Sequence, residues 1–368
     1  MIENMDIIQT QDWGLGMRKN ILISGPCSAE TAEQVMETAK GVQAQGEGID
    51  LLRAGIWKPR TRPNSFEGVG SVGLKWLKDA GNAIDKPICT EVANVKHVYE
   101  ALRNGVDVMW IGARTTTNPF AVQEIADALE GVNVPVMIKN PVNPDLNLWI
   151  GAIERIYRAG IRKIAAIHRG FSAYGESKYR NPPQWQIPIE LKRRLPQIQV
   201  ICDPSHICGK RDLLSKVSQR SYDLNFDGLM LESHPNPEKA LSDAKQQVTP
   251  ENLGKLMAGL VRRDVASDDP IFRSQLEDLR HDIDELDEDL ILMLAKRMDI
   301  VKKIGQYKKE NNITIYQSSR WNEIVNDRVR RSASKGLSED VIKEIFQMIH
   351  KESIRHQTAV MNSVEEKA

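Results

Sequence analysis

The sequence predicts an α/β protein: a parallel (β/α)8 TIM barrel followed by a separate all-α domain of three helices that dimerises. Three observations lead to this fold class. Short β-rich runs alternate with helical stretches eight times between residue 20 and about residue 263, the pattern of a parallel barrel. The runs end in polar or charged groups, and beyond residue 270 a helical stripe replaces the strand pattern. An open doubly wound sheet is the alternative, but no GxGxxG follows the first run to support it.

The composition excludes several classes of protein. The chain has 50 Lys and Arg and 50 Asp and Glu among 368 residues, and this balance argues against a nucleic-acid partner, which needs a basic surface. No apolar run reaches membrane-spanning length, and the N-terminus lacks the features of a signal peptide. The four cysteines form no CxxC pair, so we expect a reduced, cytoplasmic location without a membrane partner.

The predicted strands follow one another at the spacing of barrel units. They are residues 21–23, 51–57, 87–92, 108–113, 134–138, 163–167, 199–202 and 228–231, with helices such as 31–45, 94–104 and 119–130 between them. Each run ends in a reactive group, for example GPCS, HRG, DPSH or ESH. Because the carboxyl ends of barrel strands open on one face, we predict a functional site there.

The stretch LLRAGIWKPRTRP, residues 51–63, is the centre of that predicted site. It carries Arg53, Lys58 and Arg60, while Pro59 and Pro63 prevent a helix at its exit. Cations at the end of a buried strand cost desolvation unless an anion meets them. A solvated basic loop is the alternative. The position at a strand end, in a chain without excess charge, favours an anion site.

Residues 265–270, VASDDP, read as a linker, so the predicted domains are residues 1–264 and 271–368. Apolar residues recur near every 3.5 positions across 271–308, which predicts one long helix. Asn311 and Asn312 end it, and a second helix is predicted over 318–331. Gly336 and the cap residue Ser338 then predict a third helix over 338–361.

Two groups of side chains emerge at the predicted strand ends. The first consists of soft and hard metal donors: Cys27, His206, Glu232 and Asp243. Thiolate, imidazole and carboxylate together suit a divalent transition metal. The second is a group of cations: Arg53, Lys58, Arg60, Arg114, Lys139 and Arg169. Six cations predict a substrate with several negative charges, and a metal beside them suggests Lewis-acid activation of a carbonyl.

The motifs GPCS, KPRT, GAR at 112–114, HRG, DPSH and ESHPNPEKALSD resemble those of the metal-dependent 3-deoxy-D-arabino-heptulosonate 7-phosphate (DAHP) synthases. The resemblance spans residues 20–263 and implies condensation of phosphoenolpyruvate with erythrose 4-phosphate. It implies Cys27, His206, Glu232 and Asp243 as ligands of a divalent ion, with Mn²⁺ the first choice and Fe²⁺, Co²⁺ or Zn²⁺ as alternatives. It assigns phosphoenolpyruvate to Arg53, Lys58, Arg114, Lys139 and Arg169, and erythrose 4-phosphate to Arg60 and Thr61.

The residue types suggest how that reaction proceeds. Lys58 is the expected proton donor to the new alkoxide, because a crowd of cations lowers the pKa of a lysine. His168 or Glu91 is expected to position the attacking water, and the sequence does not decide between them. A related phosphoenolpyruvate–aldose phosphate synthase that uses arabinose 5-phosphate is the alternative, against which KPRT argues.

The helical tail carries polar residues at expected core positions. Arg297 and Lys308 lie on the apolar stripe of the long helix, where buried cations are costly, and Ser353 and Gln357 share one face of the last helix. Arg280 precedes Arg297 by 17 residues, about 25 Å along the axis, so an antiparallel partner chain is expected to supply it. The pattern alone favours a charged coiled coil.

Residues 272–361 resemble the all-helical class of chorismate mutases, through LRHDIDELDEDLILMLAKRMDIVKKIGQYKK and FQMIHKESIRHQ. The resemblance implies Arg280 (from the partner), Arg297, Lys308, Arg320, Ser353 and Gln357 around a chorismate dicarboxylate, with Arg297, Lys308 and Gln357 catalytic. It implies a homodimer through this domain, with a tetramer as a further option. Gln317 and Trp321 depart from the family pattern, which implies a weaker mutase. The alternative is a non-catalytic module that senses chorismate or prephenate and restrains the barrel.

Overall fold

The computed structural model describes residues 5–58, 65–175, 177–264, 266–316 and 318–363. The sequence predictions for Arg60, Thr61 and Gln317 lie outside this part of the chain, as do those for the side chains of Arg320 and Trp321. The chain forms two compact units, Met1–Val265 and Ala266–Ala368. Among the described residues, no helix has the length and apolar character needed to cross a membrane.

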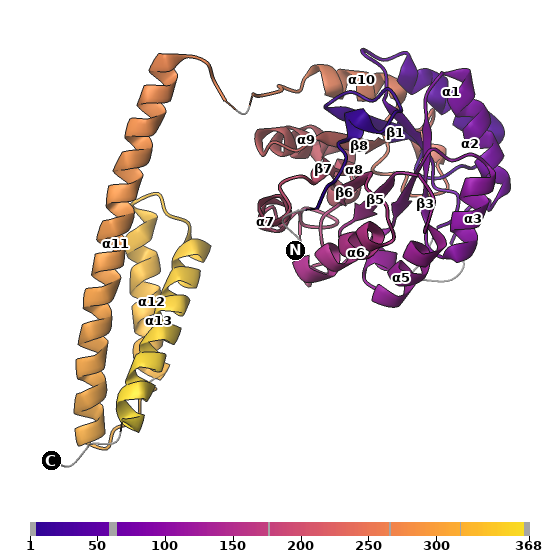
Figure 1. Ribbon diagram of the computed structural model, residues 1–368. Helices are drawn as coiled ribbons and strands as arrows, with labels where there is room; N and C mark the ends of the chain where they lie inside the picture. The colour runs from indigo at the N-terminus through magenta and orange to yellow at the C-terminus, as the bar shows by residue number, and fades with distance from the viewer. Residues whose placement is uncertain (1–4, 59–64, 176, 265, 317, 364–368) are drawn as a thin grey trace. The chain divides into compact units, whose positions relative to one another are not determined.

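The first unit is a closed barrel of eight parallel strands in chain order, with β8 returning to β1 (Figure 1). The strands are β1 (Ile21–Gly25), β2 (Leu51–Arg53), β3 (Ile88–Val92), β4 (Val108–Ile111), β5 (Val136–Lys139), β6 (Ile164–His168), β7 (Gln199–Cys202) and β8 (Gly228–Glu232). The predicted fold class is therefore confirmed. β2 is shorter than expected, because beyond Arg53 the chain pairs with the turn that follows β1, through Gly55 N and Cys27 O at 3.2 Å.

Helices surround the barrel, and capping side chains fix where several of them begin. They are α1 (Ala32–Gln43), α2 (Val72–Ala83), α3 (Val95–Arg103), α4 (Ala113–Thr116), α5 (Pro119–Ala128), α6 (Leu146–Arg158), α7 (Gln186–Arg194), α8 (Pro204–Cys208), α9 (Leu214–Asp223) and α10 (Pro250–Ala258). Thr31, Asn94 and Asp203 each accept a backbone N–H from the first turn of their helix. Such caps stabilise a helix start by about 1 kcal/mol each.

Alternation along the strands separates an outer core, under the helices, from an inner core inside the barrel. The inner cluster includes Leu51, Cys89, Met137, Ile167 and Met230, with Trp13 and Met17 packed against it from the N-terminal segment. Side chains two positions further along each strand point inward as well. The inward-facing positions at the carboxyl ends of the strands therefore converge on the mouth of the barrel.

The second unit consists of α11 (Pro270–Glu310), α12 (Ser318–Ala333) and α13 (Glu339–Asn362). The predicted cap of the last helix is present, since Ser338 accepts a hydrogen bond from Val341 N. α13 packs against both other helices. Gly305 permits close approach of α11 to α13, because a Cβ there would lie 3.3 Å from Gln357 Cα.

Candidate active sites

The four predicted metal donors come together at the mouth of the barrel. Cys27 follows β1, Glu232 ends β8, Asp243 lies in the loop after β8 and His206 lies on α8 after β7. The ligand atoms of Cys27, Glu232 and Asp243 all lie within 4.8 Å of one another. His206 Nε2 is 3.8 Å from Glu232 Oε1. Strands distant in sequence thus bring a thiol, an imidazole and two carboxylates to one point.

The imidazole of His206 is held by a buried acid. Its Nδ1 lies 2.8 Å from Asp203 Oδ2, an ion-pair distance without hydrogen-bond geometry, and its Nε2 faces Glu232. A carboxylate behind an imidazole fixes the orientation of the ring and increases its basicity as a ligand. Lys139 Nζ, 2.9 Å from the same Asp203 oxygen, completes a chain from the cation group to the metal donors.

The donor set fits a cation. Burial raises the pKa of the Cys27 thiol to about 12, and the charge of Glu232 adds to the shift while Lys58 opposes it. Glu232 Oε1 is buried and ion-paired with Arg53 at 3.1 Å, without a hydrogen-bond partner of good geometry among the described residues. A divalent ion favours the thiolate and satisfies buried carboxylate oxygens.

The predicted cations surround these donors. Arg53 ends β2, Lys139 ends β5, Arg169 follows β6 and Arg114 lies on α4 after β4. Arg53 Nη2 is 3.3 Å from Cys27 O, and its Nε and Nη1 are buried without a hydrogen-bond partner in the described part of the chain. Burial lowers the pKa of Arg169 to about 10. Buried donors without a partner mark a place prepared for an anion.

In the helical unit, two of the predicted residues meet directly. Arg297 Nη1 donates to Ser353 Oγ at 2.6 Å, and burial, with the charge of Arg328, lowers the pKa of Arg297. Gln357 lies one turn beyond Ser353 and is buried, and its Oε1 has no hydrogen-bond partner among the described residues. Lys308 Nζ donates to Ile315 O at 2.6 Å.

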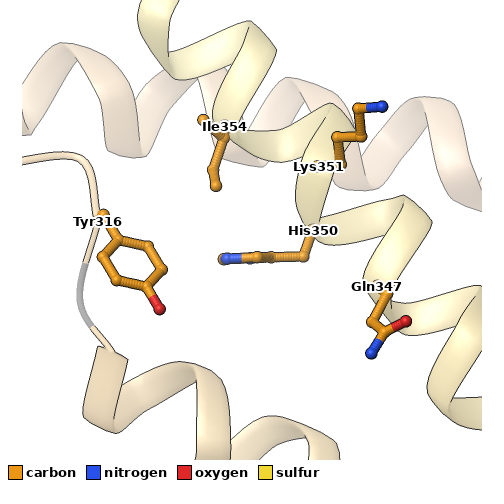
Figure 2. Close-up of a pocket in the computed structure, with 5 residues that line it drawn as sticks. All are labelled: Tyr316, Gln347, His350, Lys351 and Ile354. Carbon is orange, nitrogen blue, oxygen red and sulfur yellow. The ribbon is translucent and has the colours of Figure 1, made fainter.

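Arg280 is not brought to this contact by its own chain. Its side chain is 63% exposed and pairs with Glu277 on the same helix at 3.5 Å. A small cavity of about 300 Å³ lies in the same unit, lined by Tyr316, Gln347, His350, Lys351 and Ile354 (Figure 2). Burial and the nearby charge of Arg297 lower the pKa of His350. The cavity is therefore lined largely by polar groups, one of which is under the electrostatic influence of Arg297.

Two protein families match this chain, one in the barrel unit and one in the helical unit. Residues 5–265 match the model of the DAHP synthetase I family. The chain belongs to that family. Residues 279–358 match the model of chorismate mutase type II. The protein is an enzyme with both activities, a DAHP synthase barrel and a chorismate mutase domain.

The relatives share the barrel. A phospho-2-dehydro-3-deoxyheptonate aldolase from Thermotoga maritima is 32% identical over 251 residues, which cover 68% of this chain and 72% of that protein. A crystal structure of phospho-2-dehydro-3-deoxyheptonate aldolase (DAHP synthase) from Thermotoga maritima superposes on this chain with a TM-score of 0.61 and 31% identity. The superposition covers 68% of this chain and 71% of that chain. A 2-dehydro-3-deoxyphosphooctonate aldolase from Geobacter sulfurreducens is 24% identical over 261 residues, or 67% of this chain and 92% of that protein.

The DAHP synthase barrel contains residues near the site that the sequence analysis did not single out. Asp203 holds both His206 and Lys139. Arg180 Nη1 donates to Asp243 Oδ1 at 2.9 Å. The ring of Trp110, on β4, lies within 5.0 Å of Arg53 Cζ and 5.6 Å of Lys139 Nζ. Strand alternation is the signal that would have found Asp203 and Trp110, since each follows an inner-cluster residue by two positions.

The environment of Lys58 differs from the sequence expectation. Its Nζ lies 3.0 Å from Cys27 Sγ. Burial lowers its pKa, but the electrostatic influence of Cys27 and Glu232 outweighs burial, so the pKa is raised. The expectation that surrounding cations depress this pKa was wrong, because the amine lies beside the Cys27 sulfur and near the Glu232 carboxylate. A protonated Lys58 remains suited to proton donation.

The structure also distinguishes the two candidates for positioning water. His168 lies outside the barrel wall, where its Nε2 is 2.6 Å from Pro183 O and its ring packs against Trp185 and Phe226. Burial lowers its pKa to about 4. Glu91 instead occupies an inward position on β3, and its Oε2 accepts a hydrogen bond from Trp110 Nε1 at 2.9 Å.

Proposed function

We propose that the barrel condenses phosphoenolpyruvate with D-erythrose 4-phosphate to give DAHP and phosphate, and that the helical unit rearranges chorismate to prephenate. One observation carries the first proposal. A metal-donor set and a group of cations meet at one barrel mouth, where two buried donors of Arg53 have no partner among the described residues, as a phosphorylated enol acid and an aldehyde would require.

Cys27, His206, Glu232 and Asp243 would hold the divalent ion. We propose Mn²⁺, with Fe²⁺, Co²⁺ and Zn²⁺ as alternatives that accept the same mixed donors. When bound, such an ion supplies Lewis-acid polarisation of the aldehyde carbonyl. Arg180 would keep Asp243 in place as a ligand through their 2.9 Å contact.

The protein residues then bind the anion and move protons. Arg53, Arg114, Lys139 and Arg169 bind the carboxylate and phosphate of phosphoenolpyruvate. The enol carbon C3 forms a bond to the aldehyde carbon, and Lys58 donates a proton to the aldehyde oxygen, which becomes a hydroxyl group. Water held by Glu91 adds at C2 and gives one proton to the Glu91 carboxylate. The C2–O bond to phosphate then breaks, the proton of the C2 hydroxyl passes to the leaving phosphate, and C2 becomes the ketone of DAHP. Arg60 and Thr61 would hold the phosphate of erythrose 4-phosphate.

A substrate comparison tests the barrel proposal. The purified full-length protein with Mn²⁺ is mixed with phosphoenolpyruvate and either erythrose 4-phosphate or arabinose 5-phosphate, and phosphate release is followed. We expect turnover with the four-carbon sugar and loss of turnover on chelation, with recovery when Mn²⁺ is restored. Faster turnover with arabinose 5-phosphate would identify the related aldose phosphate synthase instead.

For the mutase we propose that Arg297, Lys308, Ser353 and Gln357 surround chorismate. The rearrangement breaks an ether C–O bond and forms a C–C bond without a covalent intermediate, so it needs a compact conformer and donors at the ether oxygen. Lys308 and Gln357 would donate there, while Arg297 and the partner's Arg280, with Arg320, would bind the carboxylates. The 2.6 Å contact between Arg297 and Ser353 supports this grouping. A direct assay of chorismate loss tests it.

We propose that a second copy of the chain covers the open face of α11. Leu279 and Leu286 on this helix are 60% and 63% exposed, and Ile283, Leu290 and Met293 are exposed between and beyond them. An apolar stripe of this length is costly in water and is typical of a helix that pairs with another. An antiparallel copy would also bring Arg280 to the other chain's Arg297. Sedimentation would show a dimer, and a monomer would contradict the proposal.

We also propose that the helical unit mediates feedback inhibition of the barrel by prephenate or chorismate. Both activities reside on one chain, and a site that binds prephenate can be coupled energetically to a second site.

A further inference from the structure

Trp110 is one of the two largest fully buried side chains of the barrel, with Trp149, and takes no part in the steps described above. Its ring lies 5.0 Å from Arg53 Cζ and 5.6 Å from Lys139 Nζ. These cations come from β2 and β5, while Trp110 comes from β4. An indole face attracts cations electrostatically, and more strongly where water is excluded. One ring therefore contacts two of the cations assigned to phosphoenolpyruvate.

Each of the two cations is also ion-paired with an acid. Arg53 pairs with Glu232 at 3.1 Å, and Lys139 with Asp203 at 2.9 Å. An acid in place of the ring would neutralise these cations and reduce their attraction for a substrate anion. The indole holds them without a negative charge. The Nε and Nη1 donors of Arg53 consequently stay buried without a protein partner among the described residues.

The edge of the same indole fixes Glu91. Trp110 Nε1 donates to Glu91 Oε2 at 2.9 Å. The other side of the carboxylate faces Gly112, where an added Cβ would meet Glu91 Oε1 at 2.2 Å. Glu91 is thus confined between an N–H donor and a glycine, and its orientation depends on Trp110.

We propose that Trp110 is a positioning residue of the synthase site with two separable functions. Its ring face sets the placement of Arg53 and Lys139 for the anion, and its N–H orients Glu91 for the addition of water. The inference rests on the proposed function, since it takes phosphoenolpyruvate as the anion and Glu91 as the group that holds water.

Two kinds of substitution separate these functions. Trp110→Phe keeps an aromatic face and removes the N–H, so we expect the Kd for phosphoenolpyruvate to stay within about threefold while kcat falls on the order of tenfold. Trp110→Leu and Trp110→Met remove the face, so we expect that Kd to rise on the order of tenfold as well. Titration calorimetry of the metal-loaded full-length protein gives Kd, and phosphate release gives kcat.

Trp149→Phe is the matched control. Trp149 is equally buried and donates Nε1 to Ile138 O at 3.1 Å, but it lies on α6 in the outer core. We expect this variant to change neither Kd nor kcat by more than about twofold. Chorismate mutase activity and a thermal melt confirm folding of each variant, and Trp110→Met, whose unbranched chain adapts to irregular space, replaces Trp110→Leu if the latter unfolds.

The inference fails if Trp110→Met binds phosphoenolpyruvate like the wild type, or if Trp110→Phe keeps the wild-type kcat. It also fails if Trp149→Phe reproduces the losses, because general packing would then explain them. Absence of condensation by the wild-type protein would contradict the proposed function instead. In that case, the Kd values for phosphoenolpyruvate of the wild type and the Trp110 variants would still test whether the ring face contributes to binding.

Discussion

Asp203 links two of the predicted site residues, His206 and Lys139. Its Oδ2 lies 2.8 Å from His206 Nδ1 and 2.9 Å from Lys139 Nζ. Burial alone would raise the pKa of this carboxyl group, but the charges of His206 and Lys139 hold it well below its usual range. The fixed charge couples the metal-donor group to the anion-binding group. Removing it would therefore disturb both.

Cys27 should be essential for only one of the two activities. We expect Cys27→Ala to lose bound metal and synthase turnover, because the thiol is one of the four donors at the barrel mouth, whereas mutase turnover should stay near the wild-type rate. Metal analysis and both assays on the same preparation check this. Cys202→Ala, which removes a buried thiol from the outer core, is the control and should keep its metal. Loss of both activities in Cys27→Ala would show that the division of function between the units is wrong.

His168 should make the barrel sensitive to acid. Burial holds its folded pKa at about 4, against 6.5 for the unfolded chain, so below pH 6.5 the unfolded state binds more protons. The contribution of the neutral His168 ring to the free energy of unfolding is fully present above pH 6.5 and is lost as the pH falls toward 4. At pH 5 the loss relative to pH 7 should be about 2 kcal/mol. Urea unfolding of the wild type and of His168→Gln at both pH values tests this, since the variant should lose less.

At the scale of single elements, α11 has two apolar sides, one that packs within its own chain and one that stays exposed. Val301 and Gly305 pack it toward α13, while Leu279, Ile283 and Leu286 remain exposed. Burial of a large apolar side chain stabilises a protein by about 1.5–3 kcal/mol. Two such helices therefore gain enough free energy from burial to associate. Pairing would cover the apolar stripe that a single chain leaves exposed.

The shared-site proposal predicts complementation between two inactive variants. Arg280→Ala and Arg297→Ala should each abolish most mutase turnover in pure form. In a mixed dimer one of the two sites regains an intact Arg280 and an intact Arg297, so random mixing should restore about a quarter of the wild-type rate. Subunits are exchanged in mild denaturant before the chorismate assay.

The control for complementation mixes Arg297→Ala with Lys308→Ala. Both residues belong to the same chain's part of the site, so each site of a mixed dimer keeps one defect and no activity should return. Recovery in this control, or none with Arg280→Ala, would place Arg280 outside the mutase site.

At the scale of the whole molecule, the two units carry separate chemistry on one chain. The barrel unit Met1–Val265 holds the predicted metal donors and the predicted anion-binding cations, and the unit Ala266–Ala368 holds the Arg297–Ser353 contact. Separate sites can be inactivated separately, whereas regulation requires that a ligand of one changes the other.

Feedback is tested by adding prephenate while phosphoenolpyruvate consumption is measured. We expect the rate to fall by fivefold or more at saturation, the usual range of allosteric coupling. In Arg297→Ala the same concentrations should have little effect, because prephenate binding is lost while synthase turnover remains. Equal inhibition of wild type and variant would indicate that prephenate binds the barrel itself.

The two-residue period of a strand made part of the barrel site predictable from the sequence, because it shows which side chains face inward. Arg53, Lys139 and Glu232 each follow an inner-cluster residue by two positions, and all three lie at the mouth. The same rule, applied strictly, places His168 outside, because Ile167 before it faces inward. Asp203 and Trp110 were also within reach of this rule. Neither was recognised, because an acid in a cap motif and a strand tryptophan have ordinary structural explanations.

The sequence by itself determined the order of eight strands and the three-helix tail, because hydrophobic period, capping residues and turn residues are local properties. Only the tertiary structure decided that β2 stops at Arg53, that Lys58 contacts the Cys27 sulfur and that the ring of Trp110 lies near two cations. The reason is physical: a pKa or a ring contact depends on neighbours in space, and barrel closure supplies these from strands far apart along the chain.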